Sequence, residues 1–123
     1  MSKRLRIVPD SEIVIAKDRM IYASTRKVNA VAKLVRGMRL QEAAQNLIFC
    51  KRSVAWEVRK VILSALSNAV HNNGLDIDKL IIKEAYVGKA VVLRRFMARA
   101  KGSGSGIRKE FSRLTIVLCE AEV

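Results

Sequence analysis

The stretch from Lys89 to Arg113, KAVVLRRFMARAKGSGSGIRKEFSR, decides the fold of this 123-residue chain. It carries eight Lys or Arg residues and a single acid, Glu110, around the glycine-serine run at residues 102–106. Apolar, strand-like sequence leads into the stretch and away from it again. This pattern predicts a long β-hairpin arm that is basic along both legs. Because such an arm cannot bury a core of its own, we expect it to lie against a polyanion.

The sequence on either side of the arm predicts the sheet from which it projects. The outgoing strand is expected from about residue 80 through 93 and on into the arm, and the returning strand from about 107 to 119. A short third strand is expected at about 19–23. Residues 1–16 are weakly patterned and are interpreted as an N-terminal extension. Residues 17–123 are interpreted as one domain, with the arm at about 87–113.

Three amphipathic helices are predicted before the hairpin, at about 26–36, 40–49 and 52–72. Ser24 or Thr25 has the chemistry to cap the first helix, and Gly37 and Gly74 suit the left-handed positions that end the first and third. The expected inward residues are Val28, Val31, Ala32 and Val35 in the first helix, Ala43, Ala44, Leu47 and Ile48 in the second, and Val54, Val58, Val61, Ile62, Ala65, Leu66, Ala69 and Val70 in the third. The fold class is therefore α+β, with three helices packed on a small antiparallel three-stranded sheet and a long protruding β-hairpin.

Composition restricts the class of partner. The net charge is +13, with 24 Lys and Arg against 11 acids, so nucleic acid or an anionic membrane is the expected partner. No apolar run approaches the roughly 20 residues that a membrane-spanning helix needs. Pro9 and Asp10 interrupt the apolar stretch after the basic start, which argues against a signal peptide and for a cytoplasmic protein.

No catalytic or metal site is expected, and no cofactor. His71 is the only histidine and falls at the end of the predicted third helix, where a structural role is usual. The glycines at 102, 104 and 106 lack the Lys-Ser/Thr pair and following helix of a phosphate-binding loop. Cys50 and Cys119 have no metal-site spacing and are expected to be buried thiols. The chain is therefore predicted not to be an enzyme.

The basic residues are expected in three places, namely the first helix, the start of the third helix, and the arm. A reader of double-stranded DNA would concentrate its base contacts on one recognition helix. Here the charge is spread over several faces, as if nucleic acid surrounded the protein. The candidate RNA-binding residues are Arg26, Lys27, Lys33, Arg36, Lys51, Arg52, Arg59, Lys60, Lys89, Arg94, Arg95, Arg99, Lys101, Arg108, Lys109 and Arg113.

Two apolar side chains, Phe96 and Met97, are interleaved with the arm's arginines. They have two interpretations that the sequence leaves open. One is packing on exposed RNA bases. The other is packing across the hairpin itself.

Three segments carry a resemblance to a known family. STRKV at 24–28 with LVRG at 34–37, SALSNAVHNNGLD at 64–76, and RFMARAKG at 95–102 occur in the order and spacing of the bacterial large-subunit ribosomal protein L twenty-two family. The resemblance extends from about residue 17 to 119. The chain departs from the family pattern at Ala98, where a proline is usual, and at Ser103, where an arginine is usual. The uncharged tip puts the RNA contacts there in question, while the legs keep their charges.

The resemblance implies a structural component of the large ribosomal subunit that binds large-subunit ribosomal RNA and supports subunit assembly. It implies neighbouring ribosomal proteins and the nascent polypeptide as further partners, in the cytoplasm or the equivalent compartment of an organelle. The arm would line the peptide exit tunnel, through the residues Leu93, Arg94, Arg95, Phe96, Met97, Ala98, Arg99, Ala100, Lys101 and Gly102. The alternatives are a free-standing nucleic-acid-binding regulator and, from the charge alone, a membrane-active basic protein.

Overall fold

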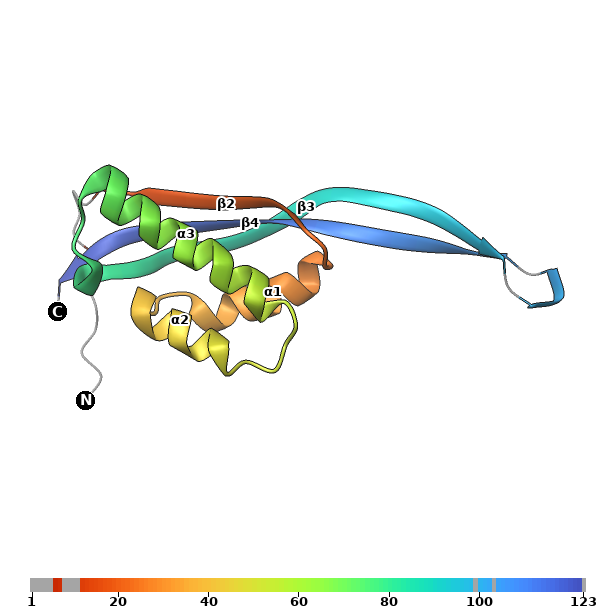
Figure 1. The fold of residues 1–123 in the computed structure, drawn as a ribbon, viewed down its shortest axis with the longest axis horizontal. Helices are drawn as coiled ribbons and strands as arrows, with labels where there is room; N and C mark the ends of the chain where they lie inside the picture. Colours follow the sequence, from red (N-terminus) through yellow and green to blue (C-terminus); the bar gives the residue numbers. More distant parts are fainter. Residues whose placement is uncertain (1–5, 8–11, 99, 103, 123) are drawn as a thin grey trace.

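The computed structural model describes residues 6–7, 12–98, 100–102 and 104–122 of the chain. Figure 1 shows three helices gathered around one half of a long β-hairpin, whose other half extends beyond them. The α+β class and the protruding hairpin predicted from the sequence are thus confirmed. The elements, in chain order, are β1 (Arg6–Ile7), β2 (Val14–Ile21), α1 (Thr25–Val35), α2 (Leu40–Ile48), α3 (Ala55–Asn73), the short 3-10 helix η1 (Ile77–Lys79), β3 (Leu80–Ala98), the 3-10 turn η2 (Ala100–Gly102) and β4 (Gly104–Glu122).

The sheet is built around β4, which pairs antiparallel with β2 and β3 and, near its end, with β1. The alternate β4 residues Leu114, Ile116 and Leu118 are fully buried in the core cluster that the helices cover. The first long strand begins at Val14, so the expected strand at 19–23 starts too late. Val14 pairs with Leu118 and is buried, and this pairing extends the strand into residues assigned to the extension.

The helices bury the predicted faces with four exceptions, of which the first, Ala44 in α2, is only half-buried. All four inward residues of α1 are buried, and Gly37 and Gly74 follow α1 and α3 with φ of 76° and 61°. Ile48 at the end of α2 is 47% exposed, so its inward assignment is wrong. Leu66 and Val70 are only half-buried, because the buried stripe of α3 is narrower than its apolar stripe.

The strands β3 and β4 are 19 residues long each and pair from Leu80 opposite Glu120 to Ala98 opposite Gly104, with a first register shift between Ile82 and Glu84. A register shift between Lys89 and Val92 marks the root of the arm. From there to residue 111 every described residue is exposed or half-buried, so the arm contributes nothing to the core. Ten residues of strand project about 30 Å.

The hairpin turns earlier than expected. β4 begins at Gly104, three residues before the predicted start of the return leg at Ile107. The turn includes Lys101 and Gly102, with φ of 62° and 72°. Gly104 and Gly106 therefore lie in a strand and not in the tip.

Candidate nucleic-acid interface

The predicted RNA-binding residues lie on several sides of the molecule. Every one that the structure describes is exposed except Arg59, which is half-buried. They come from α1, from the segment between α2 and α3, from α3 itself and from both legs of the arm. Arg99, a further candidate, lies outside the described residues. The structure therefore spreads the positive charge as the sequence predicted, while the RNA contacts themselves stay a prediction.

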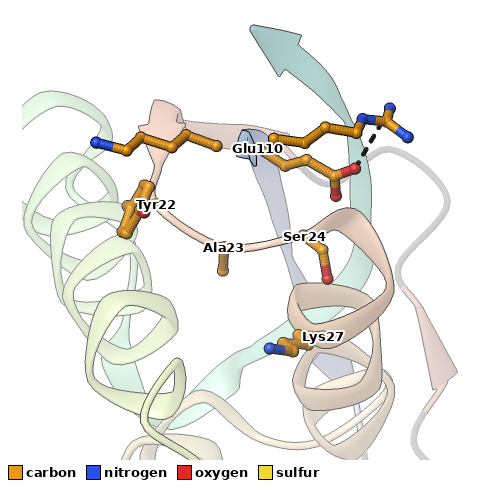
Figure 2. Close-up of a pocket in the computed structure, with 7 residues that line it drawn as sticks. Tyr22, Ala23, Ser24, Lys27 and Glu110 are labelled. Carbon is orange, nitrogen blue, oxygen red and sulfur yellow. Dashed lines mark ion pairs between the residues drawn. The ribbon is translucent and has the colours of Figure 1, made fainter. Parts of the chain in front are cut away.

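The start of α1, the end of β2 and the root of the arm enclose an open pocket of about 250 Å³. Its wall brings together three predicted candidates, Lys27 from α1 and Arg108 and Lys109 from β4. Figure 2 shows Ser24 and Lys27 on the α1 side and Glu110 on the arm side. A phosphate with several waters fits such a volume.

A partly buried hydrogen bond links the two sides of this pocket, next to the backbone pairing of Ile21 with Ser112. Ser112, at the root of the arm, is fully buried, and its Oγ donates to the Ala23 carbonyl oxygen over 2.6 Å. Ala23 precedes Ser24, which occupies the N-cap position of α1. The bond therefore ties β4 to the link between β2 and α1, and it positions Lys27 relative to the arm. The spacing of 89 residues leaves no local sequence signal for this contact.

The electrostatics of the pocket favour an anion. The helix α1 has no acidic residue in its first turn, and the Ser24 side chain makes no capping hydrogen bond. The partial positive charge of a helix N-terminus thus adds to the charge of Lys27. Glu110 opposes this, and its Oε1 lies 3.6 Å from Nη2 of Arg108. That exposed ion pair orients Arg108, and its two charges largely cancel. The electrostatic potential in the pocket is therefore positive because of Lys27 and Lys109.

Some candidate cations are engaged within the protein. The Nε of Arg36 donates to the Ala85 carbonyl oxygen over 2.6 Å and its Nη2 to Oδ1 of Asn29 over 2.7 Å, which joins α1 to β3. Lys60 pairs with Glu57 at 3.5 Å. These contacts place Arg36 among the residues that stabilise the fold, whatever else it binds.

Two aromatic features escaped the sequence reasoning. Tyr22 is 66% exposed beside the pocket, and its ring lies 5.2 Å from that of Phe111. Trp56 is also exposed, with the Arg59 guanidinium 5.8 Å from its ring centroid. The i,i+3 spacing of Trp56 and Arg59 was a usable signal, whereas Tyr22 and Phe111 meet only through the sheet.

The arm residues alternate between two faces. Arg94, Phe96 and Ala98 share one face of β3, while Leu93, Arg95 and Met97 share the other. Across the hairpin, Phe96 stands opposite Gly106 and Met97 opposite Ser105. Phe96 and Met97 therefore lie on opposite faces and cannot form one apolar surface.

The described residues hold no group of three or more His, Cys, Asp or Glu side chains placed to bind a metal ion. Within the same residues, no helix has the length and apolar content needed to cross a membrane. Cys119 is buried, and burial raises the pKa of its thiol, an effect that Lys83 partly offsets. Cys50 is only half-buried, so the expectation of two buried thiols holds for Cys119 alone.

Comparison with known proteins agrees with the resemblance found in the sequence. The large ribosomal subunit protein uL22 of Maricaulis maris is 49% identical over 117 residues, which are 95% of this chain and 92% of that protein. That of Methylobacterium sp. (strain 4-46) is 49% identical over 115 residues, 94% of this chain and 90% of the relative. That of Rhodospirillum centenum is 50% identical over 102 residues, 83% and 77% of the two chains. A family model described as ribosomal protein L22p/L17e matches residues 16–119, and the chain belongs to this family.

Proposed function

We propose that the chain is a structural component of the large ribosomal subunit that binds large-subunit ribosomal RNA and supports subunit assembly. The relatives are named as proteins of that subunit. The observation that carries the proposal is the arm, a 19-residue pair of strands that is basic along both legs and whose outer half buries no core residue. An isolated ribbon of this kind needs an anionic surface on both sides to be held in one place.

The body supplies the second point of attachment. The pocket at the root of the arm is lined by Lys27 from α1 and Lys109 from β4, and its volume suits a phosphate. Further exposed cations lie on α1 and before α3. Binding through such separate surfaces suits a folded RNA with several domains better than a single duplex.

The arm is proposed to reach into the subunit and line the peptide exit tunnel. Its length of about 30 Å beyond the body is sufficient to separate its tip from the surface on which the body sits. The nascent polypeptide would then pass the region from Leu93 to Gly102, and neighbouring ribosomal proteins would contact the body. Localisation in the ribosome follows from the same proposal.

Sedimentation of the full-length protein tests the proposal. Tagged protein in cell lysates should sediment with large subunits on a sucrose gradient and remain there at about 0.5 M monovalent salt, because many phosphate contacts act together. Replacing Lys27 and Lys109 together by Glu should release it at lower salt. Lys79→Glu, the same charge change on exposed η1, is a control expected to have a smaller effect. Protein that stays at the top of the gradient at low salt would contradict the proposal.

A further inference from the structure

On one face of the arm, an aromatic ring lies next to small residues. Phe96 is 77% exposed although it lies in a paired part of β3, two residues from the end of that strand. Its cross-strand neighbour is Gly106. The next pair toward the tip on the same face is Ala98 with Gly104. Among the residues that the structure describes, no bulky side chain therefore stands beside the ring on the tip side of this face.

The Phe96 ring packs against one particular residue of the facing strand. A Cβ built on Gly104 would overlap the Phe96 ring, so the ring lies directly on the glycine backbone. A Cβ built on Gly106 would meet nothing within 4 Å. The far end of the ring thus packs against Gly104, while Phe96 as a whole is 77% exposed. Packing on glycine by itself stabilises a hairpin, but it does not require so much of the ring to stay exposed.

The adjacent pair on the same face is strongly basic. Arg94 stands directly opposite Arg108, two residues from Phe96 along β3 toward the body and on the same face. Like charges opposite each other destabilise a sheet. Glu110 offsets only part of this through its contact with Arg108. A bound anion between the two guanidinium groups would remove the repulsion, and the two pairs are about 7 Å apart along the strand.

We propose that Phe96, seated on Gly104, is a stacking platform for one unpaired RNA base, and that Arg94 and Arg108 bind the phosphate beside that base. The inference rests on the proposed RNA-binding function and adds to it a specific nucleotide site and the face of the arm that faces RNA. A flat and largely exposed ring can stack on the π-face of a base, and the planar guanidinium groups of arginine can donate to phosphate oxygens. On the opposite face, the residues that β3 contributes, Leu93, Arg95 and Met97, include no aromatic ring.

RNA is favoured over a nascent peptide by this charge arrangement. A passing polypeptide has no fixed anion to place between Arg94 and Arg108, whereas every nucleotide has a base and a phosphate. Bases that are unpaired are the usual targets of aromatic side chains in RNA recognition. The peptide remains an outcome that the test must detect.

The test uses the full-length protein bound to deproteinised large-subunit RNA from the same cells. Short-wave ultraviolet light cross-links stacked rings directly, and mass spectrometry locates the modified residue. We expect a nucleotide adduct on Phe96 in the unmodified protein. Gly104→Ala, which displaces the ring, should reduce that adduct several-fold, while Gly106→Ala and Met97→Ala should retain it.

Binding measurements separate the ring from the charges. Phe96→Leu should weaken RNA affinity by about tenfold at fixed salt and leave the salt dependence unchanged, because no phosphate contact is removed. Phe96→Tyr should restore the affinity. Arg94→Gln should instead reduce the slope of log affinity against log salt by about one. Unchanged thermal unfolding of each variant will show that the body is intact.

Several outcomes would overturn the inference. They are an equal adduct yield in Gly104→Ala, an equal loss in Gly106→Ala, full affinity in Phe96→Leu, or a Phe96 cross-link to nascent peptide instead of RNA in translating ribosomes. Each of these leaves RNA binding by the rest of the protein intact, so the proposed function survives. If the unmodified protein fails to bind the RNA at all, the proposed function fails and the platform fails with it.

Discussion

The hydrogen bond from Ser112 to Ala23 offers a direct test of how the arm is fastened to the body. In Ser112→Ala the Cβ remains, so little cavity is created, and the change is confined to the hydroxyl group. The 2.6 Å bond is lost, and the Ala23 carbonyl is left without this donor in a partly buried position. A net hydrogen bond contributes about 1 kcal/mol and an unsatisfied buried acceptor raises the cost to about 1–3 kcal/mol.

Urea denaturation followed by circular dichroism measures this cost. The midpoint should fall while the slope stays constant, because the surface exposed on unfolding does not change. In thermal unfolding each kcal/mol corresponds to about 3–6 °C for a chain of this size. Ser64→Ala, on an exposed position of α3, is the matched control and should leave the stability within about 0.5 kcal/mol.

The same variant reports on the pocket. If the bond positions the link between β2 and α1 against the arm, Ser112→Ala should also weaken RNA binding modestly, because Lys27 and Lys109 are no longer held at a constant separation. A loss of stability below about 0.5 kcal/mol, equal to the Ser64 control, would refute the reasoning that this bond fastens the arm.

Three further predictions concern the core, the arm and the thiols. Ile62→Ala should destabilise the protein by about 2–5 kcal/mol because Ile62 is fully buried. Leu66→Ala, at a half-buried position, should cost only about 1–2 kcal/mol. Equal losses of stability in urea titrations would contradict this difference in burial. Deleting residues 95–105 should leave cooperative thermal unfolding of the body in place and lower RNA affinity, and loss of that transition would show that the arm belongs to the core. With an alkylating reagent at neutral pH, half-buried Cys50 should react first, and Cys119 should react only as the protein unfolds because it is buried and its thiol pKa is raised; similar rates by mass spectrometry would rule this out.

Local patterns predicted much of the fold. The four buried residues of α1 recur at helical spacing, and Gly37 and Gly74 end their helices in the left-handed conformation that their lack of a Cβ permits. The strands of the hairpin were recognisable from alternating apolar residues around Leu114 and Ile116. These features depend on neighbours along the chain, so a single sequence suffices to find them.

Boundaries and inward assignments were less predictable because they depend on distant partners. The strand β2 begins at Val14 because Val14 pairs with Leu118 of β4. The apolar alternation of residues 14–18 alone is too weak to predict a strand there. Ile48 is apolar and correctly spaced, yet it is 47% exposed at the end of α2. The turn moved toward Gly102 because Gly104 is held in register opposite Ala98.

The sequence by itself determined the class of fold, the basic arm and the family, because periodicity, charge and motif order are properties of the chain read in one direction. Only the tertiary structure decided how the side chains of the arm are arranged. Cross-strand register separated Phe96 from Met97, put Arg94 opposite Arg108 and seated the Phe96 ring on Gly104. A partly buried hydrogen bond between residues 89 positions apart, beside the pairing of Ile21 with Ser112, links the two sides of the pocket at its root. Such contacts depend on which strands meet and in what register, and local sequence does not specify either.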